Sequence, residues 1–585
     1  MTLRALRDAC LRGFLYGSLV YGAVLAAIHL VHNQVGSVTD ALIVFAAFGL
    51  LYGLWAAVLF GLARLAAGFF ARPDDRERRG LFWGLLAFNL VFWELFFLYG
   101  LTYDEAPLGP SAAWGMAGVL IVLALLFAVA VVAASWALAR FTERLRDRRR
   151  LAGAVAALAV VALLVNAAEP LSLEPPAAGE MAPPAIQVAD TGLKVVFVGL
   201  DGADWRVIQP LMEKGELPTF AAMMKQGASG DLGSIHDSNS AVIWASIYTG
   251  VTPDRHGVQD FYRISLPGMK TGLYPVHRTY FKELADLTAP LGLARQVPVD
   301  RFSMKTPPVW EVVDRAGLTT GVVDGYFYSF PALRPSRPES WFFTYGLDLL
   351  AERASPRAEL FVQPKQLFRE VRPLLAGGDF YWQSATLFEM LAKRPQPRFI
   401  NFYTHEPDSA QHFYWKWWEP ERYFGVTAQG LKENAERIPK VHRDFDAFLA
   451  RLRKQVGPET VIVVASDHGH SPTIVHSLYT QHRHGPPGIV LMQGGPVKPG
   501  AVLRGADVYD LYPTLLYLLG LPVPRDAEGK VLLEALDPAF VRAHPVREVP
   551  SYAGLGLSPG IPGASRDGEM NDAEIEKLKA LGYIF

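Results

Sequence analysis

The sequence predicts an α/β fold, a mostly parallel β-sheet sandwiched by helices, preceded by an all-α transmembrane domain. Three observations predict it. Five long apolar runs lie within residues 1–168. After residue 192, short runs of β-branched and aromatic residues alternate with helical patterns, which is typical of a parallel sheet covered on both faces. Several of these runs end in Asp, at the position where α/β sheets hold their ligands.

The N-terminal apolar runs include "ALIVFAAFGLLYGLWAAVLFGLA" and "LFWGLLAFNLVFWELFFLYGL". Each of the five is about long enough to cross a ~30 Å hydrocarbon core as a helix, which takes roughly 20 residues. A cleaved signal peptide fits poorly, because four more apolar runs follow the first. We therefore expect a five-helix transmembrane bundle over residues 1–168. In its third helix, Glu94 is an ionisable residue that we expect either to order the helices or to contact a polar head group.

Arginines in the short loops predict how this bundle is oriented. The N-terminus, the second loop and the fourth loop carry arginines, whereas the first and third loops carry neither Lys nor Arg. Under the positive-inside rule, the N-terminus then lies in the cytoplasm and the chain after residue 168 lies outside it. We expect a multi-pass protein of the cell inner membrane with its soluble part on the periplasmic side. The single cysteine, Cys10, then faces the reducing compartment.

The soluble part is expected to begin after a linker. Residues 169–192 are rich in Pro and Ala, which suits an extended segment and no packed element. Strand and helix patterns then alternate over residues 193–545, with an insertion at about 258–395, and residues 546–585 form a C-terminal tail. After residue 168 acidic residues outnumber basic ones. We therefore expect no nucleic-acid binding, which needs a basic face.

Three apolar runs end in carboxylates and imidazoles. Their polar residues are Asp201 in the first, Asp408 and His412 in the second, and Asp467, His468 and His470 in the third. Asp408 and His412 stand four residues apart, so a helix would place both on one face. A buried carboxylate is costly unless a metal or a cation offsets its charge. Carboxylates with imidazoles and no thiolates suit zinc or a similar first-row metal in a catalytic setting. We interpret His405, His442 and His476 as structural or surface residues.

The stretch "HDSNSAVIWASIYTG", residues 236–250, offers candidate nucleophiles. If "AVIWASIY" begins a helix with Ser240 as its N-cap, free backbone N–H groups and the helix dipole favour a phosphate there. A zinc ion at the hydroxyl would lower its pKa and remove the need for a base. Ser238 could also cap that helix, whereas Ser246 and Thr249 would lie inside it or at its far end. Without the metal ligands, an ordinary capping serine would be the better interpretation.

A series of motifs in order along the chain carries a family resemblance. The motifs are "GLDGADW", "NSAVIWASIYTGVTPDRHG", "DSAQHFYW", "ASDHGH", "HGPPGIVL" and "YDLYPTLLYLLGLPVPRDAEGKVL". From about residue 193 to 535 the chain resembles the type I phosphodiesterase and nucleotide pyrophosphatase branch of the alkaline phosphatase superfamily. The nucleophile of that family stands nine residues before the Thr of a "TG" pair, which here is Thr249. The resemblance therefore also selects Ser240.

The resemblance implies an alkaline-phosphatase-like fold with two zinc ions, or similar divalent metals, at the C-terminal edge of the sheet. One ion would be held by Asp408, His412 and His484, with His482 as the alternative to His484. The other would be held by Asp201, Asp467 and His468, with the oxygen of Ser240 beside it.

Two departures narrow what the resemblance implies. Nucleotide pyrophosphatases carry an Asn three residues after the nucleophile, whereas this chain has Ile243, so a nucleotide preference is not expected. Sulfatases of the superfamily need Cys or Ser in a C/S-x-P-x-R sequence, and Ser240 is followed by "AVIW". A sulfatase of that kind is excluded.

The leading functional hypothesis is a membrane-anchored, zinc-dependent phosphodiesterase that acts outside the cytoplasm through a phosphoseryl intermediate. Its substrate would be a phosphodiester, such as a lipid or glycan head group. One alternative is a phospholipid head-group transferase of the phosphoethanolamine or phosphoglycerol type, and another is a non-catalytic membrane scaffold. We expect substrate selection in the insertion and in the aromatic stretch 412–424, which could instead serve core and lid packing.

Overall fold

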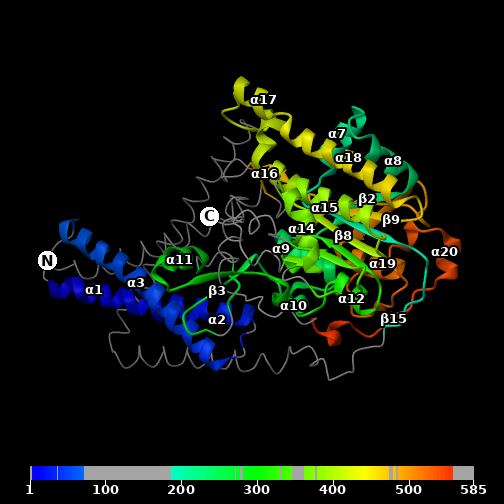
Figure 1. Cartoon of the computed structure of the whole chain (residues 1–585). Coiled ribbons are helices and arrows are strands. Elements are labelled where there is room, and N and C mark those ends of the chain that lie inside the picture. Colours follow the sequence, from blue (N-terminus) through cyan, green and yellow to red (C-terminus); the bar gives the residue numbers. More distant parts are fainter. Residues whose placement is uncertain are drawn as a thin grey trace. The chain divides into compact units, whose positions relative to one another are not determined.

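The computed structural model describes residues 3–33, 35, 37–70, 186–236, 238–269, 272–276, 281–329, 333–344, 361–375, 378–472, 479–481 and 485–557. The chain divides into two compact units (Figure 1). The first unit contains Met1–Ala177 and Tyr262–Val297, and the second contains Ala178–Phe261 and Pro298–Phe585. Part of the expected insertion, residues 262–297, thus groups with the N-terminal residues.

The first unit begins with a helical hairpin. Its first half consists of α1 (Leu3–Tyr16), a π-helical turn (Gly17–Gly22) and α2 (Ala23–His32), and its second half is α3 (Val38–Phe70). Leu3–His32 and Val38–Leu65 are long and apolar enough to cross a membrane. The five-helix bundle is therefore represented by two candidate spans in the described part of the chain. The other three predicted helices, with Glu94, lie outside the described residues.

Small residues let the two halves of the hairpin approach closely, as is common between membrane helices. A Cβ at Gly17 would lie 2.2 Å from the carbonyl oxygen of Tyr52, so only glycine fits there. Beside it, the Ser18 hydroxyl donates a hydrogen bond of 2.7 Å to the Gly49 carbonyl. Large apolar side chains are more than half exposed along α3 at four-residue spacing, namely Leu50, Leu54, Val58 and Leu62. Such a stripe is typical of a surface that faces lipid or another apolar partner.

We call residues 262–297 the arm, because this segment packs on the hairpin within the first unit. It contains β3 (Tyr262–Ser265), α11 (Phe281–Thr288), a 3₁₀ turn (Ala289–Leu291) and the start of β4 (Arg295–Pro298), which pairs with β3. The Asn33 side chain forms two hydrogen bonds with the Tyr274 backbone, at 3.1 and 2.5 Å. The backbone N–H of Val276 donates to Nε2 of the buried His29 (3.3 Å). The ring of Phe281 lies 4.9 Å from that of His29.

The second unit contains a nine-stranded sheet in the order β13-β2-β12-β9-β1-β8-β5-β6-β7. Its strands are β1 (Val195–Leu200), β2 (Ala228–Gly233), β5 (Thr320–Val323), β6 (Trp341–Phe343), β7 (Val362–Gln363), β8 (Phe399–Thr404), β9 (Val461–Ala465), β12 (Gly488–Gln493) and β13 (Ala501–Asp507). The five neighbours β9, β1, β8, β5 and β6 are parallel, whereas β12 is antiparallel to both of its neighbours. The prediction of a mostly parallel sheet in an α/β unit is confirmed.

Helices pack on both faces of this sheet. The helices described in this unit are α7 (Trp205–Glu213), α8 (Pro218–Gln226), α9 (Ser240–Thr249), α10 (Pro253–His256), α12 (Val309–Arg315), α14 (Phe368–Val371), α15 (Asp379–Lys393), α16 (Glu406–Trp418), α17 (Ala428–Asn434), α18 (Arg437–Val456), α19 (Leu511–Leu518) and α20 (Pro538–Ala543). Short strand pairs are formed by β10 (Ser471–Pro472) with β11 (Thr480–Gln481) and by β14 (Val523–Pro524) with β15 (Glu548–Val549).

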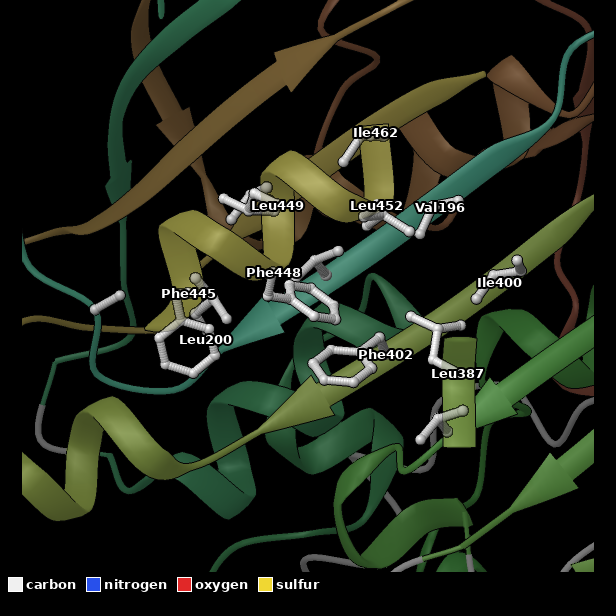
Figure 2. Close-up of a cluster of buried hydrophobic side chains, with 14 of the residues drawn as sticks. Val196, Leu200, Leu387, Ile400, Phe402, Phe445, Phe448, Leu449, Leu452 and Ile462 are labelled. Carbon is white, nitrogen blue, oxygen red and sulfur yellow. The ribbon is translucent and has the colours of Figure 1, made fainter. Parts of the chain in front are cut away.

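Alternating side chains of β1 assign these two faces. Val196 and Leu200 join the core that α18 covers with apolar residues such as Phe448 (Figure 2). The rings of Phe402 and Phe448 lie 4.6 Å apart there, a contact worth about 0.5–1.5 kcal/mol beyond the burial of apolar area. Phe197 points to the other face, where its ring lies 6.4 Å from that of Trp244 on α9. The central strand is therefore held between α18 and α9, and its carboxyl end is fixed in place.

Candidate metal and nucleophile site

Three adjacent strands bring the predicted ligands to one edge of the sheet. Asp201 directly follows β1, and Asp467 and His468 follow β9. Asp408 and His412 lie on α16, which begins just after β8. Since β9, β1 and β8 are parallel neighbours, their carboxyl ends meet at the same edge. All five side chains are buried.

The first ligand group contains Asp201, Asp467 and His468, and Ser240 lies against it. The ligand atoms of the three residues all lie within 4.8 Å of one another. Nε2 of His468 is 3.4 Å from Oδ1 of Asp201 and 3.2 Å from Oδ2 of Asp467. Oγ of Ser240 is 3.0 Å from Nε2 of His468 and 3.3 Å from Oδ1 of Asp201. The structure thus brings together these four predicted residues.

The second ligand group contains Asp408, His412 and His470, again with ligand atoms within 4.8 Å of one another. Oδ1 of Asp408 lies 3.4 Å from Nε2 of His412 and 3.0 Å from Nε2 of His470. The same oxygen is 4.0 Å from Nε2 of His468, so the two groups are adjacent. The predicted third ligand, His484, and its alternative His482 lie outside the described residues.

Thr480 orients both imidazoles of the second group. Its carbonyl oxygen lies 2.9 Å from Nδ1 of His412, and its hydroxyl lies 2.9 Å from Nδ1 of His470. Each ring therefore uses Nδ1 for Thr480 and turns Nε2 toward Asp408. Histidines that bind metals are commonly held in this way by a partner on the other ring nitrogen.

His470 is the residue of this group that sequence reasoning did not assign as a ligand. A signal was present, because His468 and His470 flank a single glycine in "DHGH" and both follow the end of β9. What brings His470 to Asp408 is Thr480, ten residues further along the chain. A contact of that kind is set by tertiary structure and not by local spacing.

The charge of the site fits a cation. Burial, and then the charge of Asp467, raise the pKa of Asp201 well above its usual range. Burial likewise raises the pKa of Asp467 to about 7. Burial acts in the same direction on Asp408, but His412 and His470 outweigh it and hold the pKa of Asp408 well below its usual range. Three buried carboxylates with imidazoles and a hydroxyl form a donor set that suits two divalent ions such as zinc.

Two donors hold the outer oxygen of Asp201. Its Oδ2 accepts hydrogen bonds from the Tyr403 hydroxyl (2.6 Å) and from Nε1 of Trp244 (2.9 Å). Oδ1 is then left to face Ser240 and His468. One carboxylate oxygen is thus held by neighbouring side chains of the fold, and the other faces the ligand group.

Gly202 is required by the close approach of the two ligand groups. Its backbone has φ = 67°, in the left-handed region, and its N–H donates to Oδ1 of Asp467 (3.1 Å). A Cβ there would lie 2.6 Å from Nε2 of His470 and 2.9 Å from Cα of Asp408. Any other residue would therefore displace the second group.

Ser240 is the first residue of α9, and the N-cap is Asn239. The prediction that Ser240 caps the helix is wrong by one residue, because Oδ1 of Asn239 accepts from the backbone N–H of Val242 (3.2 Å). This shift leaves the Ser240 hydroxyl available to the ligand group. Ser238, half-buried, precedes the cap.

The other candidate hydroxyls of this stretch bind backbone. Those of Ser246 and Thr249 donate to the helix carbonyls of Val242 and Ala245. Ser246 also pairs with Nε2 of His256 at 3.0 Å. Both hydroxyls therefore serve the helix, as their predicted positions inside it imply.

His442, His405 and Trp415 have structural partners. Nδ1 of the buried His442 lies 2.9 Å from the Ile438 carbonyl of its own helix, and Nε2 of His405 lies 3.1 Å from Oδ2 of Asp379. In the aromatic stretch 412–424, Trp415 is buried, with its ring stacked 6.3 Å from that of His470. Trp415 thus serves core packing. His476 lies outside the described residues.

A family model identifies the family of the chain. The model of the type I phosphodiesterase / nucleotide pyrophosphatase family matches residues 195–508, more than half of the 585-residue chain. The chain belongs to this family. The matched range includes both ligand groups and Ser240.

Other similarities are partial. Over 94 residues the chain is 38% identical to a phosphopentomutase of Symbiobacterium thermophilum, a stretch that covers 16% of this chain and 23% of that protein. Over 100 residues it is 40% identical to a 2,3-bisphosphoglycerate-independent phosphoglycerate mutase of Cereibacter sphaeroides, covering 16% and 19%. The chain thus spans less than a quarter of the length of these curated relatives.

Among solved structures, human ectonucleotide pyrophosphatase / phosphodiesterase 5 aligns at 13% identity with a TM-score of 0.36, covering 59% of this chain and 99% of that one. A phosphonate monoester hydrolase from Silicibacter pomeroyi aligns at 16% identity with a TM-score of 0.35, covering 59% and 76%.

Proposed function

We propose that the protein is a zinc-dependent phosphodiesterase that works through a phosphoseryl intermediate on Ser240. One observation carries this proposal: the Ser240 hydroxyl lies 3.0 Å from His468 in a group of three ligands, with a second group of three directly beside it. The membership of the chain in a phosphodiesterase family supports the same reaction class. Two intact ligand groups argue against a non-catalytic scaffold.

Each of the two ligand groups would bind one metal ion. Asp201, Asp467 and His468 would hold the ion next to Ser240, and Asp408 and His412 would hold the other together with His470 or the predicted His484. Bound divalent ions in such a site lower the pKa of a nearby hydroxyl and neutralise charge on phosphoryl oxygens.

Ser240 would act as the nucleophile in an in-line displacement. Oγ forms a bond to phosphorus, the bond from phosphorus to the leaving oxygen breaks, and the proton lost by Ser240 balances the proton gained by the leaving alcohol. Water then cleaves the phosphoseryl bond and regenerates the hydroxyl. Backbone N–H groups at the start of α9 offer an anion site beside Oγ.

Membrane anchoring belongs to this proposal. The two long apolar helices and the exposed stripe on α3 suit a hairpin in lipid. The arginines of the short loops favour a multi-pass chain with a cytoplasmic N-terminus, which would leave the catalytic unit on the periplasmic side. A substrate with a lipid or glycan head group would fit that location.

The test compares Ser240→Ala with Ser238→Ala on an aryl phosphodiester, with the metal content of each protein measured by elemental analysis. We expect about two ions per chain in both variants and turnover only in Ser238→Ala. An active Ser240→Ala protein, or a fully active metal-free one, would contradict the proposal. Labelled lipids and separation of the products would distinguish hydrolysis from transfer to an acceptor alcohol.

A further inference from the structure

Asp260 lies near the point where the chain passes from the second unit to the arm. Its side chain is buried, and its Oδ1 accepts hydrogen bonds from Nδ2 of Asn239 (2.8 Å) and from the backbone N–H of Phe261 (2.7 Å). The Phe261 carbonyl in turn accepts from the N–H of Val299 at 2.9 Å. The chain that departs for the arm and the chain that returns from it are thus bonded to each other, with Asp260 beside this junction.

Asp260 decides how Asn239 caps the nucleophile helix. An asparagine amide has one end that accepts hydrogen bonds and one that donates them, and either could face the helix if nothing fixed it. Oδ1 of Asp260 accepts from the NH₂ end of Asn239 and so fixes which end faces Asp260. The amide oxygen is then turned toward the N–H of Val242, which it caps at 3.2 Å. Ser240 follows directly on this cap.

We propose that Asp260 is a positioning residue for the reaction, acting through Asn239 on the first turn of α9 and so on Oγ of Ser240. The inference rests on the proposed function, in which Ser240 is the nucleophile. Oγ must reach phosphorus while staying next to His468 and Asp201, and a misplacement of about 1 Å at a reacting atom can cost roughly 100-fold in rate. In this role Asp260 acts through Asn239 and not by contact with the reacting atoms.

The position of Asp260 also ties the arm to the nucleophile. The arm begins two residues later, at Tyr262, and is fastened to the hairpin through Asn33 and His29. Ordering of the arm and ordering of the cap therefore share one short stretch of backbone, residues 260–261. The hairpin is thus connected, through the arm, to the backbone that precedes it at residues 260–261.

The chain offers a matched control in Asp300. Like Asp260 it is buried and accepts backbone N–H groups, those of Phe302 (2.9 Å) and Ser303 (3.1 Å), close to where the arm returns. It caps a short 3₁₀ turn, Arg301–Ser303, and not α9. Removing its carboxylate should cost comparable cap stability without moving Ser240.

The experiment measures kcat, KM and metal content of the full-length protein with an aryl phosphodiester. We expect Asp260→Ala to lower kcat about 10- to 100-fold with KM and metal content nearly unchanged. The isosteric Asp260→Asn should lose less, because its amide oxygen can still accept from Asn239, and it keeps the test usable if the Ala variant folds poorly. Asp300→Ala should keep kcat within about twofold.

A double variant completes the test. Asn239→Ala should lower kcat as Asp260→Ala does, and combining the two should bring little further loss, since both break one route. Full activity of Asp260→Ala, additive losses in the double variant, or an equal loss in Asp300→Ala would each overturn the positioning role. An active Ser240→Ala protein would refute the proposed nucleophile instead, so the two failures are distinguishable.

Discussion

Replacing Thr480 with Val tests whether His470 belongs to a metal site. The change removes the hydroxyl that lies 2.9 Å from Nδ1 of His470, but it keeps the carbonyl that binds Nδ1 of His412. Val is nearly the same size as Thr, so the packing of this buried position is retained. The same hydroxyl lies 3.3 Å from Nδ1 of His412, but that ring keeps its contact with the carbonyl, so the orientation of His470 should suffer most.

The magnitude follows from the role of such partners. Loss of a group that orients a metal-binding histidine typically costs 10- to 100-fold in metal affinity, or about 1.4–2.7 kcal/mol. We therefore expect Thr480→Val to release one of the two proposed zinc ions at a 10- to 100-fold lower concentration of a competing chelator. The other ion should stay bound as in the unchanged protein.

A second buried threonine provides the control. Thr514, on α19, accepts a hydrogen bond from the backbone N–H of Leu532, away from the described ligand groups, so Thr514→Val should leave both affinities unchanged. Equal zinc affinity in Thr480→Val and the unchanged protein would refute the assignment of His470. A loss seen with His484→Gln but not with His470→Gln would instead support the ligand that the family resemblance implies.

Three more outcomes are expected. Gly202→Ala should bind less zinc, measured by elemental analysis, because its Cβ would lie 2.6 Å from Nε2 of His470. Burial lowers the pKa of His442 to about 4, whereas the unfolded chain takes up that proton below about 6.5. Stability should therefore fall as pH drops from 6.5 toward 4, and His442→Gln should lose about 2 kcal/mol less than the unchanged protein between pH 7 and 5, measured by thermal unfolding. Asn33→Ala should speed amide hydrogen exchange at Tyr274, since it removes the acceptor of that N–H; unchanged exchange would contradict the docking of the arm.

The sheet and its ligand-bearing edge were predictable because the determinants are local. A buried parallel strand reads as a continuous apolar run, and a residue within two positions of its end, such as Asp201 or Asp467, must lie at the carboxyl edge. Asp408 and His412 followed from helical spacing on α16. The predicted N-cap was wrong by one residue, because Asn239 and Ser240 are both good capping residues and only the fold decides between them.

The rest depends on contacts between distant parts of the chain. His470 is oriented by Thr480, and Asn33 meets Tyr274 across 241 residues. Neither pair leaves a periodic signal in the sequence. The arm was expected to be part of an insertion into the catalytic domain, and its pairing with the hairpin could not be deduced from composition or charge.

The hairpin and the arm depend on each other chemically. His29 is fully buried near the end of an apolar helix, where an unsatisfied ring nitrogen would be costly, and its Nε2 is satisfied by the backbone of Val276 in the arm. Conversely, Phe281 of the arm is buried against Phe48 of the hairpin, with ring centroids 4.6 Å apart. A protein cut after the hairpin would expose Phe281 and leave residues 262–297 without their partner. Reduced activity in such a fragment would therefore report on the order of the arm as much as on membrane attachment, which is why single substitutions in the full-length chain separate the two roles better.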